Sequence, residues 1–121
     1  MIGIGVDLVE VDRMRDTLAR TPTFAARVFT EGERAYAESA TDPSERYAAR
    51  FAAKEAVLKA LGVGIGAAGW HDIEVVRAES GAPVLHLRGR AAALADAAGV
   101  TGWRISLTHT RDTAEAVVVA L

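Results

Sequence analysis

The amino-acid sequence predicts an α+β fold in which a mostly antiparallel sheet packs against one long helix. Two pairs of short apolar segments, each joined by turn-forming residues, are typical of β-hairpins. One long segment, Pro43–Leu61, has helix-start residues at one end and is followed by glycine at the other. The expected order is a strand, a run of helices, a hairpin, a further helix and a second hairpin, which is typical of α+β proteins.

The chain begins with an apolar, β-branched run, Met1–Val9, which we expect to form a central strand. The glycines of this run are expected where a neighbouring backbone comes close. Apolar residues at helical spacing then predict a helix over Val11–Arg20, which Pro22 ends. A second, short helix is expected to hold Phe24 and Val28.

Two helix starts follow. Thr30 and Glu33 stand in the pattern of a capping box, which places a helix over Glu31–Ser39. Asp42 is expected to cap the next helix, because a proline and a glutamate follow it at positions that favour initiation. That helix, Pro43–Leu61, is the longest of the chain.

The second half of the chain predicts two hairpins with a helix between them. The segments Ile73–Arg77 and Val84–Arg88 flank a Ser-Gly-Ala-Pro turn and form the first hairpin. An alanine-rich helix is expected over Arg90–Ala98. The segments Trp103–Thr108 and Ala114–Leu121 form the second hairpin around an Arg-Asp turn.

Length and composition limit the classes of function. The 121 residues are interpreted as one domain, residues 1–121, and a chain of this size is expected to share any large ligand with a second subunit. With 14 basic and 16 acidic side chains, the net charge of −2 gives no general support for binding nucleic acid or an acidic membrane. Cysteine is absent, which excludes disulfides and thiolate metal sites. No segment resembles a signal peptide or membrane span, so we expect a cytoplasmic protein.

The long helix contains both lysines of the chain, Lys54 and Lys59, whereas twelve arginines are spread along the sequence. Lys54 is expected inside the apolar arc of this helix, with Glu55 and Lys59 at its edge. A lysine in an apolar arc needs an anion or a route for its charge to reach water. Lys54 therefore either pairs with a nearby acid as a structural residue or binds an anionic ligand.

Asp7 interrupts the first apolar strand and must find partners when the chain folds. It either accepts hydrogen bonds at the start of the following helix or forms a metal site with Glu55. Two carboxylates from different elements suit Mg²⁺, which takes few protein ligands and keeps waters and phosphates for the rest. Cations nearby then favour a polyphosphate ligand. The candidate phosphate ligands are Arg50, Lys54, Lys59 and the amides of a loop that contains Gly62, Gly64 and Gly66.

His109 ends a predicted strand, where a side chain can reach a cleft. It is either a ligand-binding group or a hydrogen-bonded structural histidine. A serine triad of Ser106, His109 and Asp7 is not favoured, because Ser106 lacks the strand-to-helix turn on which such nucleophiles often lie.

Residues 13–27 have a local surplus of positive charge, with four arginines and one acid. Such a run is either an ordinary solvated face or a docking strip for an acidic partner. The arginines are Arg13, Arg15, Arg20 and Arg27.

Four ordered motifs make the sequence similar to the holo-acyl-carrier-protein synthase group of 4′-phosphopantetheinyl transferases over nearly its whole length. They are Gly5–Arg13, Arg27–Glu33, Arg50–Gly62 and Ser106–Thr110. Each is weakly specific alone, whereas their order and spacing in so short a chain form a strong joint signal. The resemblance implies Mg²⁺-dependent transfer of phosphopantetheine from coenzyme A to a serine of apo-acyl carrier protein, with release of adenosine 3′,5′-bisphosphate.

The resemblance also implies roles for individual residues. Asp7 and Glu55 would be the Mg²⁺ ligands, and either Glu55 or a water oriented by one of these acids would take the serine proton. Lys54 or Lys59 would neutralise the departing bisphosphate or supply a proton. The coenzyme phosphates would be surrounded by Arg50, Lys54, Lys59, the Gly62–Gly66 loop and His109.

The same resemblance implies partners and an assembly. Arg13, Arg20 and Phe24 would face an acidic helix of the carrier protein. The chain would form a homotrimer, with coenzyme sites at the subunit boundaries. Two other functions stay open on the residues alone: a Mg²⁺-dependent phosphoryl or pyrophosphate hydrolase, and a non-catalytic module that binds a coenzyme.

Overall fold

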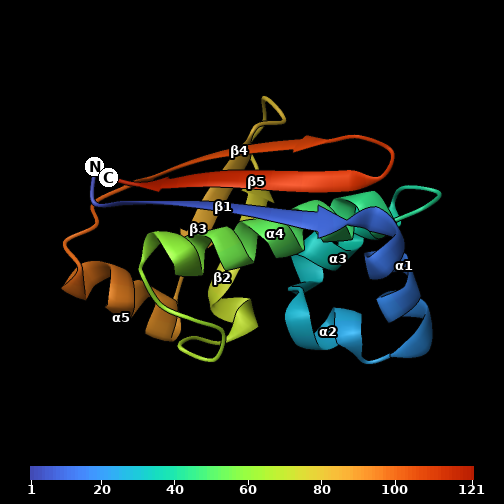
Figure 1. Cartoon of the computed structure of the whole chain (residues 1–121), viewed down its shortest axis with the longest axis horizontal. Helices are drawn as coiled ribbons and strands as arrows, with labels where there is room; N and C mark the ends of the chain where they lie inside the picture. The colour runs from blue at the N-terminus through green and yellow to red at the C-terminus, as the bar shows by residue number, and fades with distance from the viewer.

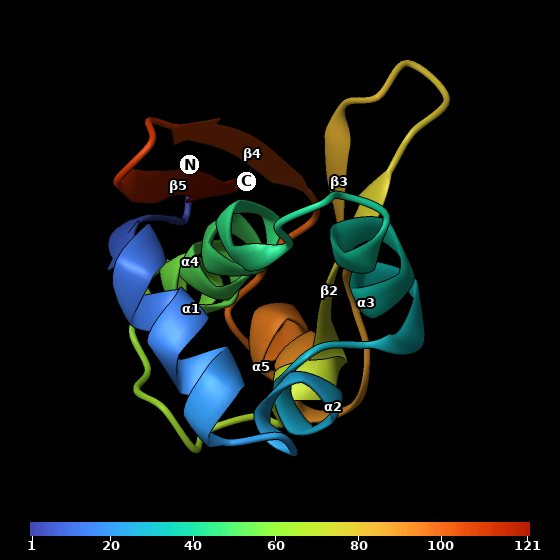
Figure 2. The same ribbon diagram turned by 90° about the vertical axis from the view of Figure 1, so that its right-hand side faces the viewer.

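The computed structural model describes all 121 residues and confirms the α+β class. The strands form two antiparallel sheets, one with the order β1-β5-β4 and one made of β2 and β3. The long helix α4 lies against the three-stranded sheet, while α1, α2 and α3 gather near its N-terminal end (Figure 1). Seen along α4, the β2–β3 hairpin stands beside the larger sheet (Figure 2).

The bounds of the elements agree closely with those predicted from the sequence. The short 3₁₀ helix η1 (Trp70–Asp72) was not predicted. In chain order, the other elements are β1 (Gly3–Glu10), α1 (Val11–Arg20), α2 (Phe24–Val28), α3 (Glu31–Glu38), α4 (Ser44–Ala60), β2 (Ile73–Arg77), β3 (Pro83–Leu87), α5 (Gly89–Ala97), β4 (Trp103–His109) and β5 (Thr113–Ala120).

The strand β1 lies at an edge of its sheet, so the expectation of a central strand was wrong. It pairs only with β5, over its whole length. Its glycines meet a helix instead of a second strand: a Cβ atom on Gly3 would lie 2.0 Å from the carbonyl oxygen of Ala60, and one on Gly5 would lie 1.9 Å from that of Ala56. The close backbone approach predicted for these glycines is therefore present, and it lets β1 pack directly against α4.

The starts of α3 and α4 use the predicted capping residues. Thr30 Oγ1 accepts a hydrogen bond from the Glu33 amide at 3.2 Å, and Glu33 Oε1 accepts one from the Thr30 amide at 2.9 Å. Asp42 Oδ1 accepts from the Ser44 amide at 3.0 Å, although Pro43 occupies the N-cap position of α4. These contacts satisfy amides that an isolated helix end leaves unpaired.

Half of the buried residues of α4 are alanines, whose small side chains let β1 and β5 come close to the helix axis. The wholly buried alanines are Ala48, Ala52, Ala53 and Ala56. None of the helices combines the length and the apolar character that crossing a lipid bilayer requires.

Candidate functional site

Asp7 of β1 and Glu55 of α4 line one cavity of about 430 Å³ between β1, α1 and α4. Asp7 is two residues beyond Gly5, so it points to the same face of β1, toward α4. Burial raises the pKa of the Glu55 carboxyl, and the charge and hydrogen bond of Asp7 raise it further, while Lys59 opposes this shift. The structure therefore brings together the two acids that the sequence singled out.

Lys59 follows Glu55 by one turn of α4 and reaches across to β1. Its Nζ donates to Asp7 Oδ1 and to the Val6 carbonyl oxygen, both at 3.0 Å. The Lys59 side chain is about half exposed, so a ligand in the cavity can reach it. Asp7 thus finds its partner in a lysine, and its alternative interpretation as a cap of α1 was wrong, because that helix start has no side-chain cap.

The donor set at this cavity fits Mg²⁺. Two carboxylates lie together, and no cluster of three or more histidine, aspartate or glutamate side chains exists that could complete a metal shell alone. Magnesium typically binds to one or two carboxylates and fills its shell with waters and phosphate oxygens. A cation between Asp7 and Glu55 would also relieve the repulsion that raises the pKa of Glu55.

Lys54 lies elsewhere, in the core between α4, α3 and β2. Its Nζ is 2.8 Å from Glu33 Oε1 and donates to the carbonyl oxygens of Trp70, at 3.0 Å, and Ile73. Burial lowers the pKa of the Lys54 ammonium, and Glu33 opposes this. Glu33 Oε2 also accepts from the Val75 amide at 2.8 Å. Three acceptors match the three N–H groups of Lys54, so the geometry favours the structural interpretation of this lysine over a ligand-binding one.

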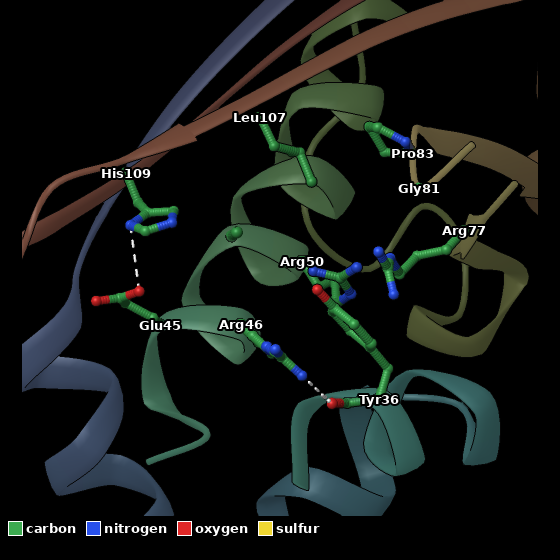
Figure 3. A pocket seen from close by; sticks show the side chains of 10 residues that line it. Tyr36, Glu45, Arg46, Arg50, Arg77, Gly81, Pro83, Leu107 and His109 are labelled. Atoms are coloured by element: carbon green, nitrogen blue, oxygen red, sulfur yellow. Dashed lines mark hydrogen bonds and ion pairs between the residues drawn. The ribbon is translucent and has the colours of Figure 1, made fainter. Parts of the chain in front are cut away.

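Arg50 and His109 line a different cavity, of about 350 Å³, which shares no residue with the first (Figure 3). His109 Nδ1 lies 3.2 Å from Glu45 Oε1. The Arg50 side chain is buried, and its Nε has no hydrogen-bond partner. One chain therefore separates two groups of residues that the sequence had assigned to a single coenzyme site.

Three further residues of this cavity were missed by the sequence analysis. Tyr36, Arg46 and Arg77 come from α3, α4 and β2, and they meet only when these elements pack together. Arg46 stands one helical turn before Arg50, which is the only local signal that could have indicated it. Nothing in the sequence around Tyr36 or Arg77 distinguishes them from ordinary surface residues.

The glycine-rich loop after α4 presents open backbone. Gly62 and Gly66 have φ values of 72° and 97°, a conformation that favours glycine. A Cβ atom on Gly62, Gly64 or Gly66 would have no heavy atom within 4 Å. The amides of Gly62 and Val63 donate to the carbonyl oxygens of Lys59, at 3.0 Å, and Leu58, at 2.9 Å, whereas the amides of Gly64 and Gly66 have no backbone acceptor and can bind a ligand.

Arg13 and Phe24 border the Asp7–Glu55 cavity, and Arg20 is exposed at the end of α1. Arg15 differs from these arginines, because it pairs with Asp12 and, at 2.7 Å, with Asp42 Oδ2. Of the arginines in the positively charged segment 13–27, Arg15 therefore forms ion pairs within the chain, whereas Arg13 and Arg20 form none.

Comparison with known proteins shows the family of the chain. A family model described as the 4′-phosphopantetheinyl transferase superfamily matches residues 3–118. A holo-[acyl-carrier-protein] synthase of Frankia alni is 51% identical over 120 residues, which cover 99% of this chain and 97% of that protein. The crystal structure of holo-[acyl-carrier-protein] synthase from Neisseria meningitidis has a TM-score of 0.90 at 32% identity and covers 100% of this chain and 98% of its own. The Helicobacter pylori synthase in complex with coenzyme A has a TM-score of 0.86 at 31% identity, covering 98% and 99%. This chain belongs to the 4′-phosphopantetheinyl transferase superfamily.

Proposed function

We propose that the chain, as one domain of residues 1–121 acting in the cytoplasm, is a holo-[acyl-carrier-protein] synthase. It transfers 4′-phosphopantetheine from coenzyme A to a serine of apo-acyl carrier protein and releases adenosine 3′,5′-bisphosphate. The observation that carries the proposal is the meeting of Asp7 and Glu55 in one cavity, with Lys59 bound to Asp7, in a chain of this family.

Asp7 and Glu55 would hold Mg²⁺, which supplies positive charge to the pyrophosphate when bound. Glu55 takes the proton of the attacking serine, because its carboxylate lies in the same cavity as Asp7, where the pyrophosphate would be held. Lys59 neutralises the leaving bisphosphate, and the amides of Gly64 and Gly66, which have no backbone acceptor, bind coenzyme phosphates. Lys54 has no part in these steps, since its ammonium is enclosed by Glu33 and two carbonyl groups.

The separation of the two cavities supports a homotrimer with its active sites at subunit boundaries. Arg50 and His109 of one copy would meet coenzyme A that is bound at Asp7 and Glu55 of another. The outer face of β1 supports such an assembly, because it exposes a row of apolar side chains on an edge strand. These are Ile4, Val6 and Leu8, with 55%, 47% and 62% of their surfaces exposed.

Replacing Ile4 with lysine is expected to dissociate the trimer, because the assembly would bury an unpaired charge at this edge. Light scattering coupled to size-exclusion chromatography measures the change in mass. The matched control is Val84→Lys, at an exposed valine of β3 in the other sheet, which should leave the mass unchanged. A wild-type chain that runs as a monomer would contradict the proposed assembly.

The direct test of the function is mass spectrometry of an apo-carrier incubated with the protein, coenzyme A and Mg²⁺. The expected result is a gain of one phosphopantetheinyl group on the carrier serine, which is lost when Mg²⁺ is omitted. Consumption of coenzyme A without carrier modification would favour the hydrolase instead. Coenzyme binding without turnover would favour the non-catalytic module.

Arg13, Arg20 and Phe24 form the proposed docking surface for the carrier protein, beside the Asp7–Glu55 cavity. Arg13→Glu and Arg20→Glu should each raise KM for the carrier about tenfold, because each replaces an attraction to an acidic helix with repulsion. The KM for coenzyme A should change much less. Added salt screens charges, so it should bring the KM of the variants for the carrier closer to that of the wild type. Arg90→Glu, at an exposed arginine of α5, is the control. Equal effects at Arg13 and Arg90 would argue against a docking surface on α1.

A further inference from the structure

Lys54 and Glu33 form a buried ion pair that the proposed mechanism does not use. Their charged atoms lie 2.8 Å apart, and neither side chain has any exposed surface. Two charges lose their hydration when they are buried, and their attraction offsets this loss only where further hydrogen bonds satisfy them. A buried ion pair is therefore weak evidence for stability, and the segments that its hydrogen bonds hold in place indicate its role.

The remaining donors of Lys54 bind the segment that ends the glycine-rich loop. Its Nζ donates to the carbonyl oxygens of Trp70, at 3.0 Å, and Ile73. Trp70 directly follows Gly69, the last residue of the loop, so Lys54 connects the end of the loop to the helix from which the loop starts. The Trp70 ring also packs against Phe51, one turn earlier on α4, with the ring centroids 5.2 Å apart. Two side chains of α4 therefore hold the far end of the loop.

Between its ends, the loop has little support of its own. Figure 1 shows it leaving the C-terminal end of α4 and turning back beneath the helix toward β2. Its first residues are fixed by hydrogen bonds to the last turn of α4. The middle is open: Ile65 is 70% exposed, and one backbone hydrogen bond, from the Ala67 amide to the Gly64 carbonyl oxygen at 3.2 Å, joins its two sides. The position of the amides of Gly64 and Gly66 thus depends on how the ends of the loop are held.

Glu33 fixes the direction of the Lys54 ammonium. Its Oε1 also accepts from the Thr30 amide at 2.9 Å, and its Oε2 accepts from the Val75 amide at 2.8 Å. The carboxylate is thereby bound to the start of α3, to α4 and to β2, and it cannot rotate without breaking one of these bonds. A lysine stem is flexible, so an immobile acid at its tip determines where its other two donors point.

We propose that Lys54 is a positioning residue, oriented by Glu33, that fixes the glycine-rich loop in the conformation that binds coenzyme phosphates. It acts through the amides of Gly64 and Gly66 and does not itself contact the coenzyme. The inference rests on the proposed function, which assigns these amides to the coenzyme. A loop that already has its binding conformation loses less conformational freedom when the ligand binds, which strengthens binding. The lysine therefore contributes to the KM for coenzyme A and not to the rate of transfer from bound coenzyme.

The test compares two variants that differ only in the lysine. Lys54→Met alone leaves the Glu33 carboxylate buried without a cation, so it is expected to destabilise the fold. The double variant Glu33→Gln/Lys54→Met removes both charges. Its reference is Glu33→Gln, because both proteins carry the same glutamine and only the reference keeps the lysine donors. The double variant should raise KM for coenzyme A about tenfold over the reference, while kcat and the Mg²⁺ concentration for half-maximal rate stay within about twofold.

Hydrogen exchange locates the effect on the chain. In the double variant, the amides of residues 62–69 should exchange faster than in Glu33→Gln, while those of β1 and β5 keep their protection. Tyr47→Phe is the matched control, because it removes the hydrogen bond of another buried α4 side chain, from the Tyr47 hydroxyl to Glu38, at the end of the helix away from the loop. It should change neither the KM for coenzyme A nor the exchange of the loop.

A double variant that binds coenzyme A as Glu33→Gln does would overturn the inference, and so would one whose kcat falls while its KM is retained. A raised KM with unchanged loop exchange would show that Lys54 contacts the coenzyme directly, which the inference excludes. A double variant that does not fold also contradicts it, because the pair would then hold the whole core and not the loop.

The proposed function fails separately from this inference. A wild-type protein that modifies no carrier would exclude the transferase. Isothermal titration with coenzyme A, without carrier protein, would in that case still show weaker binding by the double variant than by Glu33→Gln, and the role of Lys54 in positioning the loop would stand.

Discussion

Replacing Glu55 with glutamine or Asp7 with asparagine is expected to reduce transfer of phosphopantetheine by about a hundredfold to ten-thousandfold, the usual contribution of an acid or base at a reacting group. Each substitution removes a charge from the pair that lies in the β1–α4 cavity while nearly keeping the shape of the side chain. The Glu55 change also removes the group that we propose as the base. The fold should persist, because neither side chain fills the core, and circular dichroism checks this.

The mass of the carrier protein after timed incubation measures the loss, at several Mg²⁺ concentrations. Excess Mg²⁺ should partly restore the transfer rate of Asp7→Asn, because this change only weakens the proposed metal site. It should restore the rate of Glu55→Gln less. Glu79→Gln, at an exposed acid of the β2–β3 turn, is the matched control and should behave as the wild type. Wild-type rates in either cavity variant would refute the role assigned to that residue.

Replacing Gly5 with alanine is expected to lower the free energy of unfolding by more than the about 1–3 kcal/mol that overpacking of a core typically costs. The new Cβ atom would lie 1.9 Å from the carbonyl oxygen of Ala56, and backbone on both sides leaves no flexible side chain to move away. β1 would have to separate from α4, which also moves Asp7 away from Glu55. Urea denaturation followed by circular dichroism measures the change.

Gly64→Ala is the control for this prediction. Gly64 has no positive φ, and a Cβ atom there would have no heavy atom within 4 Å. The Gly64→Ala variant should therefore have the same urea unfolding midpoint as the wild type. If Gly5→Ala unfolds at the same urea concentration as Gly64→Ala, the close contact of β1 with α4 does not limit stability.

Local signals predicted most of the fold. The capping box of Thr30 and Glu33 and the turn residues of both hairpins act within a few residues, so their structural effects could be read from neighbouring positions. The place of β1 in the sheet depends on contacts between distant segments. Its glycines indicated a close backbone, but the sequence does not show whether that backbone belongs to a strand or a helix.

The same distinction applies to the candidate site. Asp7 and Glu55 could be paired because Asp7 interrupts an apolar strand and Glu55 lies at the edge of the apolar arc of its helix. The enclosure of Lys54 by Glu33 could not be identified from the helix alone, since the acid lies in α3 and the two carbonyl groups follow the glycine-rich loop. The grouping of three arginines on Tyr36 likewise joins three elements through packing.

The burial of Lys54 has a practical consequence for covalent labelling. The chain has two lysines, and the Lys54 side chain has no exposed surface, so amine-directed dyes, cross-linkers and resins can couple only to Lys59 and the terminal amine. Lys59 is bound to Asp7. A fluorophore attached through succinimidyl chemistry would therefore occupy the mouth of the Asp7–Glu55 cavity, and a tag introduced by thiol chemistry at an added cysteine is the better choice.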